Sequence, residues 1–142
     1  MKKLISMLFC VGALALSACS PDMKNSASAK SNLTGASYSV EVYGEAEAKT
    51  RIQNLKYDGF TFKDALVADK GSGDDKDLLI AFFFNNIDDA SNFMTGDNNN
   101  IVLMNKYCED NLGKNLQTRV GTYNNVAYCG SETSFQAAFG GF

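Results

Sequence analysis

The sequence predicts an α+β domain with one disulfide, in which helices pack mainly on one face of a small antiparallel or mixed sheet. Two strand patterns support this class. Residues 38–43 alternate apolar and polar side chains, and residues 78–84 form an unbroken apolar run of strand length. A third observation concerns connections: those expected between neighbouring strands are too short for the crossovers that parallel strands require.

The first part of the domain reads as strand, helix and strand. Gly44 ends the strand over 38–43, and the helix that follows has acidic residues early and basic residues late, as the helix dipole favours. The apolar positions of this helix, at helical spacing, are Ala48, Ile52 and Leu55. Asp58 and Gly59 stop the helix, and a second strand is expected over 60–67.

The central part reads as a loop, a buried strand and an interrupted helix. Residues 69–77 are rich in Gly, Ser and Asp and predict a solvated loop, and the run 78–84 predicts the most buried strand. Asn85 or Asn86 can cap a helix whose apolar face includes Phe93. A second helix is expected over 101–111.

The last part reads as a hairpin and a final helix. Residues 116–120 alternate, residues 126–129 supply the partner strand, and Asn124–Asn125 suits the turn because Asn tolerates positive φ. Ser131 is expected to cap a short helix that ends the domain.

The N-terminus carries a processing signal. Lys2 and Lys3 precede an apolar run over 4–16, and small residues lead to Cys19 in the sequence Leu16-Ser17-Ala18-Cys19. The run is too short for a membrane-spanning helix, which needs about 20 apolar residues. A plain secretory signal would need an Ala-x-Ala-like cleavage site, which the residues before Cys19 do not fit.

These four residues resemble the lipobox of bacterial lipoproteins. The resemblance implies that residues 1–18 are a signal peptide, that cleavage occurs before Cys19, and that acyl chains on Cys19 anchor the protein to a lipid bilayer. Ser20 then implies the periplasmic face of the outer membrane in a Gram-negative cell. In a cell without an outer membrane, the anchor would place the protein on the outer face of the cell membrane.

The composition after the signal suggests a tether and one domain. Residues 19–37 are rich in Ser, Ala and Asn without an apolar period, so we expect a flexible tether that holds a globular domain over 38–142 roughly two nanometres from the bilayer. Cleavage would remove two lysines and change the net charge from −3 to −5. Nucleic acid is therefore not expected as a partner, because its phosphates require clustered Lys and Arg.

The cysteines predict a disulfide. Cys10 leaves with the signal and Cys19 is consumed by lipid, which leaves Cys108 and Cys129 as a pair in an oxidising compartment. Their bond should stabilise the fold by about 3 kcal/mol.

No catalytic, metal or cofactor site is expected. The chain has no histidine, which excludes Ser-His-Asp triads and His-based zinc sites. The aspartates over 74–77 lack the register of a calcium loop, and Asp88 and Asp89 fit a helix N-terminus. Ser131 lacks the glycine pattern of a nucleophile elbow.

Four functional hypotheses remain open. The leading one is a non-catalytic binding module for an envelope protein or cell-wall polymer, with a contact surface drawn from the tyrosines Tyr43, Tyr57, Tyr107, Tyr123 and Tyr128. Residues 38–62, with a strand over 38–43, a helix that includes Leu55, and then Gly59–Phe60, resemble the start of a SPOR-type domain, which implies peptidoglycan binding. A small hydrolase using carboxylates is the third, and a sensor or inhibitor that binds a small ligand between the sheet and the helices is the fourth.

Overall fold

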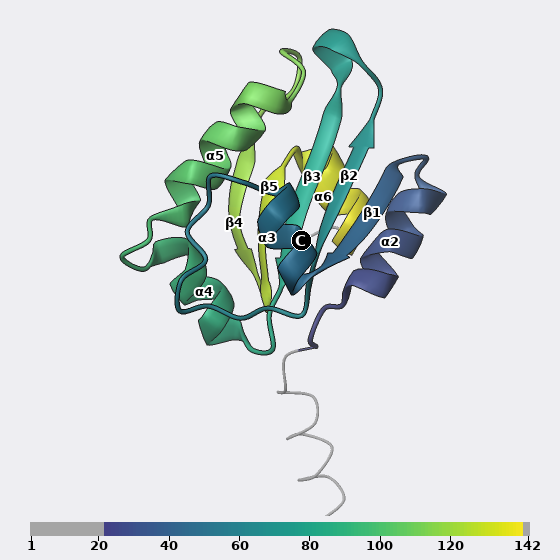
Figure 1. Cartoon of the computed structure of the whole chain (residues 1–142). Helices are drawn as coiled ribbons and strands as arrows, with labels where there is room; N and C mark the ends of the chain where they lie inside the picture. Colours follow the sequence, from purple (N-terminus) through teal and green to yellow (C-terminus); the bar gives the residue numbers. More distant parts are fainter. Residues whose placement is uncertain (1–21, 141–142) are drawn as a thin grey trace, which may run out of the picture.

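A computed structural model describes residues 22–140 of the chain, and its architecture is a sheet between two layers of helices (Figure 1). The described strands form one antiparallel sheet in the order β1-β2-β3-β5-β4. These strands are β1 (Ser39–Gly44), β2 (Asp64–Lys70), β3 (Asp77–Phe83), β4 (Arg119–Tyr123) and β5 (Val126–Gly130). The helices are α2 (Ser26–Gly35), α3 (Glu45–Arg51), α4 (Ile87–Thr95), α5 (Asn100–Asn111) and α6 (Glu132–Phe139), with a 3-10 turn at Gly73–Asp75. The predicted α+β class and antiparallel sheet are confirmed.

Strand β3 lies in the middle of the sheet, and all of its residues are buried. Because successive side chains of a strand point to opposite faces, β3 divides its apolar side chains between two cores. Phe82 belongs to the core on one face, which we call the Phe82 core, and Phe83 belongs to the core on the other, the Phe83 core. The unbroken apolar run in the sequence therefore reflects a strand covered on both sides.

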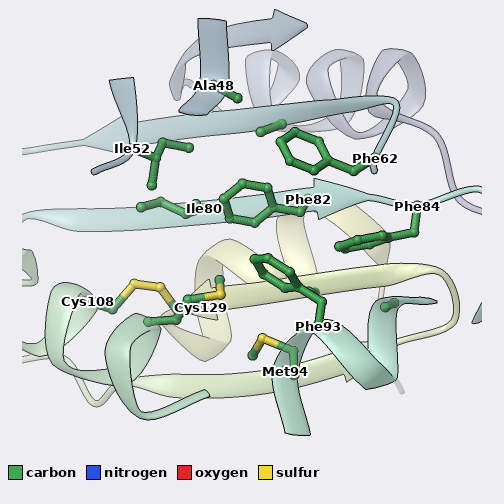
Figure 2. Close-up of a cluster of buried hydrophobic side chains, with 14 of the residues drawn as sticks. Ala48, Ile52, Phe62, Ile80, Phe82, Phe84, Phe93, Met94, Cys108 and Cys129 are labelled. Carbon is green, nitrogen blue, oxygen red and sulfur yellow. A yellow bond between two sulfur atoms is a disulfide. The ribbon is translucent and has the colours of Figure 1, made fainter. Parts of the chain in front are cut away.

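The Phe82 core is covered by α3, α4, α5 and the irregular segment 52–63 (Figure 2). Aromatic rings dominate it: Phe62 meets Phe82 edge to face with ring centroids 5.1 Å apart, and Phe93 of α4 lies 5.4 Å from Phe82. The Cys108–Cys129 disulfide joins α5 to β5 in this core, with both residues fully buried. The predicted disulfide is thus confirmed.

The Phe83 core is covered by α2 and α6, so helices lie on both faces of the sheet, whereas the sequence predicted them mainly on one face. The difference arises because α2 was not expected and α6 packs on the face opposite α3, α4 and α5. Helix α2 contributes Ala29 and Leu33, at 1% and 0% exposure, and α6 contributes Phe135 and Ala138. The Ser131 side chain accepts a hydrogen bond from the Ser134 amide, so the predicted cap of the last helix is confirmed.

The flexible tether predicted over 19–37 is wrong for the described part of that range. Residues 26–35 form α2, whose first turn is capped by the Asn25 side chain, which accepts from the Ser28 amide. Ser26, Ala29 and Leu33 lie on one buried stripe of this helix. Leu33 is the large apolar residue of this stripe, and the small side chains of Ser26 and Ala29 allow the helix to approach its neighbours closely. Residues 19–21 lie outside the described residues.

Three other boundaries differ from the prediction. Residues 60–63 precede β2 rather than belong to it. The Phe62 amide donates to the Glu45 carboxylate (3.1 Å), and contact with β3 starts at the Lys63 amide, which donates to the Phe83 carbonyl (2.8 Å). At the other end, β2 continues to Lys70, within the predicted loop, since its backbone stays paired with β3 as far as Asp77. Helix α3 ends at Arg51, earlier than predicted, and Ile52 begins the irregular segment.

Candidate functional site: the clamped strap and the adjoining cleft

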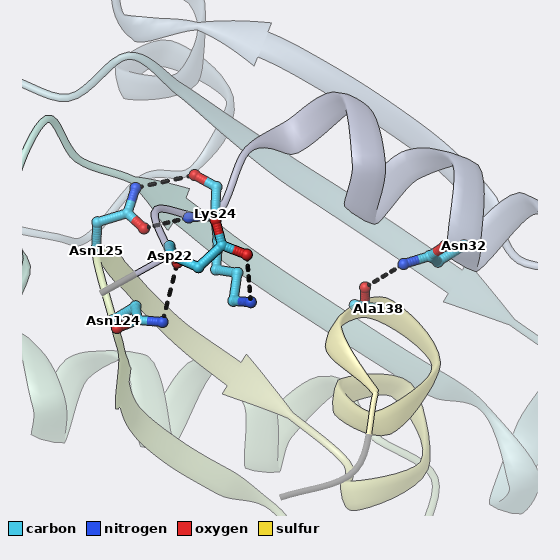
Figure 3. A network of polar contacts seen from close by, with 6 residues as sticks. All are labelled: Asp22, Lys24, Asn32, Asn124, Asn125 and Ala138. Atoms are coloured by element: carbon cyan, nitrogen blue, oxygen red, sulfur yellow. Dashed lines mark hydrogen bonds and ion pairs between the residues drawn. The ribbon is translucent and has the colours of Figure 1, made fainter. Parts of the chain in front are cut away.

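Residues 22–25, which we call the strap, connect the N-terminus to α2 and are fixed to one end of the sheet. The Lys24 amide donates to Asn125 Oδ1 (2.7 Å), and Asn125 Nδ2 donates back to the Lys24 carbonyl (3.0 Å). Asn124 Nδ2 also donates to the Asp22 carbonyl (3.2 Å) (Figure 3). The β4–β5 turn therefore holds the strap by its backbone.

Asn125 is fully buried and acts as the centre of this clamp. Its Nδ2 also donates to the Phe84 carbonyl (2.8 Å), and its own carbonyl accepts from the Phe84 amide (2.8 Å). The side-chain amide thus pairs with the Lys24 peptide as a neighbouring strand would, while the main chain extends the β3–β5 ladder. Asn124 has φ of 52°, which confirms the predicted turn at this position.

A cleft of about 190 Å³ opens beside the strap, between α2 and α6. Its lining residues are Asp22, Met23, Lys24, Asn25, Ser28, Ala29, Asn32, Ala138 and Phe139. Asn32 Nδ2 donates to the Ala138 carbonyl (2.9 Å) and ties the two helices together (Figure 3). The cleft contains one carboxylate, Asp22, whose side chain is 95% exposed and 4.0 Å from Lys24 Nζ. A hydrolase based on two carboxylates would need a second acid here, so the geometry of this cleft does not favour it.

A second buried polar group, Asp77, serves the fold rather than a reaction. Asp77 Oδ2 accepts from the Tyr38 hydroxyl (2.7 Å), and Oδ1 accepts from the Ser131 hydroxyl (2.5 Å) and the Leu78 amide (2.8 Å). This carboxylate therefore links Tyr38, just before β1, to the start of β3 and to Ser131, just before α6. Burial and the Asp77 hydrogen bond raise the pKa of Tyr38 above its ordinary value of about 10, and burial raises the pKa of Tyr57.

The predicted tyrosine surface is wrong as a single patch. Tyr43, Tyr57 and Tyr107 pack against the Phe82 core, and Tyr123 and Tyr128 belong to the Phe83 core, so the sheet separates the two groups. Tyr128 is 7% exposed. The other four are half-buried, and the Tyr57 hydroxyl donates to the Ile52 carbonyl (2.6 Å).

The acidic residues weighed in the sequence have local roles. Asn86 caps α4 by accepting from the Asp89 amide (2.8 Å), and its Nδ2 donates to the Asp89 carboxylate (2.8 Å). Asp75 accepts from Asn115 Nδ2 (2.7 Å), which ties the β2–β3 loop to the segment after α5. Within residues 22–140, no group of three or more Cys, Asp or Glu side chains is arranged to hold a metal ion.

The sequence reading missed the buried asparagines. Asn100, fully buried like Asn125, accepts from the Lys56 amide (2.9 Å) and donates to the carbonyls of Lys56 (2.8 Å) and Phe93 (3.1 Å). Each asparagine binds one lysine peptide that lies far away in the sequence and one further carbonyl, which is distant for Asn125 (Phe84) and seven positions away for Asn100 (Phe93). The sequence indicates these two buried asparagines only weakly. Each lies at a junction between elements, but many exposed asparagines of this chain lie in similar positions.

Cys19 lies outside the described residues, so the structure neither supports nor opposes its acylation. Among the helices of residues 22–140, none is long and apolar enough to span a bilayer. Comparison of the chain with family models, with curated proteins and with solved structures returned no match.

Proposed function

We propose that the protein is a lipid-anchored domain of the bacterial cell envelope, held to a bilayer by acyl chains on Cys19, that binds another envelope protein or a cell-wall polymer. The observation that carries the proposal is the sequence Leu16-Ser17-Ala18-Cys19 after a basic and then apolar N-terminus. Three acyl chains on one cysteine would make the anchor effectively permanent, since each buried CH₂ contributes about 0.8 kcal/mol.

The disulfide supports an exported location. Cys108 and Cys129 are bonded and fully buried, and such bonds persist in oxidising compartments but are rare in the cytosol of most organisms. A binding role rather than a catalytic one is supported by the local structural roles of the acidic residues described above and by the lack of histidine in the sequence.

Metabolic labelling tests the anchor. Cells expressing the full chain are grown with an alkyne fatty acid, and the purified protein is assayed for attached label. We expect labelling that Cys19→Ser abolishes. Cys10→Ser is the matched control, because this cysteine also lies in the N-terminal region but within the part removed by cleavage, and it should leave the labelling unchanged. Equal labelling of wild type and Cys19→Ser would refute the proposal.

Peptidoglycan is a specific candidate partner, on the resemblance of residues 38–62 to the start of a SPOR-type domain. These residues correspond to β1, α3 and the segment leading to β2. Sedimentation with insoluble peptidoglycan tests this candidate, with bovine serum albumin as the control for trapping. Saturable co-sedimentation of the protein would support it, and recovery no greater than that of albumin would eliminate it.

A further inference from the structure

We propose that one end of the sheet rests directly on the bilayer that holds the anchor, so that the fold has a fixed orientation to the membrane surface. This end, which we call the turn end, consists of the strap, the connection 84–87 and the turn 124–125. The proposal rests on the proposed acylation of Cys19, and its partner is the lipid surface itself.

The short chain between the anchor and the fold is the first argument. The Asp22 carbonyl is already bound to Asn124, and only three residue steps separate Asp22 from Cys19. Three extended steps span at most about 11 Å. The headgroup region of one leaflet is itself about 5–8 Å thick. A cysteine whose acyl chains lie in the bilayer would therefore hold the turn end at the level of the headgroups.

The hydrogen bonds that fix the strap keep the connection between Cys19 and the fold short. Freeing residues 22–25 to lengthen the connection would break both hydrogen bonds between Asn125 and Lys24 and would leave Asn125 Oδ1 without the donor it now has. An unsatisfied buried polar group costs about 1–3 kcal/mol, and here the loss would also uncap α2 at Asn25. The strap therefore behaves as part of the fold and not as a tether.

The exposed apolar side chains of the turn end are the second argument. Met23 in the strap and Ile87 at the start of α4 are 39% and 38% exposed. In the described residues, the other large hydrophobic side chain exposed to this degree is Val102 on α5. Met23 precedes Lys24, whose amide binds Asn125, and Ile87 ends the short connection that follows β3, so both residues lie at the turn end. Exposed apolar side chains at this level favour the interface between headgroups and acyl chains.

Charge does not provide the attraction. The exposed charged side chains at or near this end have both signs, namely Asp22, Lys63 and Asp88, with Lys24 partly buried beside Asp22. Binding to anionic headgroups requires a basic cluster, which this mixture does not form. We therefore expect the orientation to depend on the anchor and the two apolar side chains, and to be insensitive to salt.

This orientation determines which surface faces away from the membrane. β3 has seven residues, and at about 3.3 Å per residue its far end lies more than 20 Å beyond the turn end. The loop 71–76 is at that far end, held to the segment after α5 by the Gly113 amide, which donates to the Lys76 carbonyl (2.8 Å). A partner in the surrounding compartment would therefore meet this loop and the sides of the helices, not the strap.

Fluorescence quenching in proteoliposomes tests the proposal. The lipidated full-length product is reconstituted in phosphatidylethanolamine and phosphatidylglycerol with a fluorophore on one introduced cysteine, either Asn85→Cys or Ser72→Cys. Both positions are exposed, and Asn85→Cys keeps Met23 and Ile87 in place. A nitroxide-labelled lipid with the spin label near the headgroup is the quencher. We expect loss of most of the fluorescence at Asn85→Cys, none at Ser72→Cys in the distal loop, and the same result at high salt. Equal quenching at both positions, or none at Asn85→Cys, would overturn the proposed orientation.

Flotation of the same samples separates this inference from the proposed function. If the protein does not float with the vesicles, the anchor itself has failed. If it floats and Asn85→Cys is not quenched, the anchor stands and the orientation is wrong. A ten-residue Gly-Ser insertion after Pro21 is the matched control for tether length, and we expect it to reduce the quenching at Asn85→Cys. Unchanged quenching would contradict the role assigned to the short connection.

Discussion

Leu33→Ala distinguishes a structural α2 from a flexible tether. Leu33 is fully buried in the Phe83 core, and its carbonyl accepts from the Tyr38 amide (3.0 Å) where the chain turns into β1. Truncation of a fully buried leucine removes its transfer free energy and leaves a cavity, at a cost of about 2–5 kcal/mol. A leucine in a tether would contribute nothing, so the two descriptions differ by several kcal/mol.

This loss is a large part of the stability of a single domain, which is about 5–15 kcal/mol. The assay is urea unfolding of the chain from Ser20 onward, followed by far-UV circular dichroism. Lys30→Ala is the matched control, because Lys30 is exposed on the same helix, and surface substitutions of this kind change the free energy of unfolding by about 0.5 kcal/mol or less. A midpoint for Leu33→Ala that equals the midpoint for Lys30→Ala would refute the packing of α2 described above.

Three other predictions follow from the described contacts. The double variant Cys108→Ala/Cys129→Ala should lose about 3 kcal/mol of unfolding free energy, and mild reduction of the wild type should give a comparable loss in the same urea assay. Asn125→Asp removes two donated hydrogen bonds and buries a charge, so limited proteolysis should cut the strap faster than in wild type, whereas Asn124→Asp, at the half-buried neighbour, should have a smaller effect. Tyr38 and Tyr57 have raised pKa values in the folded protein, so above about pH 10 these tyrosines lose their protons in the unfolded chain before they do so in the fold. The free energy of unfolding should then fall by up to about 1.4 kcal/mol per pH unit for each tyrosine. Urea midpoints between pH 8 and pH 11 measure this, and a flat profile would contradict the burial of the two hydroxyls.

Local patterns predicted the elements whose signals are complete within a few residues. The apolar run that became β3, the Asn86 cap of α4 and the Ser131 cap of α6 were all placed correctly. Each depends on chemistry between near neighbours, namely continuous burial of a strand and side-chain capping of the first helical turn. The disulfide was also predictable, because removing Cys10 and Cys19 left one pair.

Helix α2 was missed because its buried stripe contains one large apolar residue, Leu33, beside small ones. Ser26, Ala29 and Leu33 follow helical spacing, but only Leu33 is a strong apolar signal, and the segment reads as a polar linker by composition. What stabilises α2 is contact with α6 and the sheet, which are encoded elsewhere in the chain. Propensity and periodicity therefore could not reveal it.

The clamp and the cleft were missed for a related reason. Asn125 binds Lys24 across 101 positions of sequence, and a sequence without aligned homologues contains no sign of that pairing. The tyrosines were grouped by residue type alone. The sequence does not show on which face of the sheet each one lies, and the structure divides them between the two faces.

Intact mass spectrometry of the protein extracted from membranes is the decisive test of the acyl anchor. We expect a chain that begins at Cys19, carries the mass of a diacylglyceryl group and an amide-linked acyl chain on that residue, and is two hydrogens lighter because of the Cys108–Cys129 bond. A mature chain that begins elsewhere, or a Cys19 without added lipid mass, would contradict the anchor and the membrane orientation inferred from it.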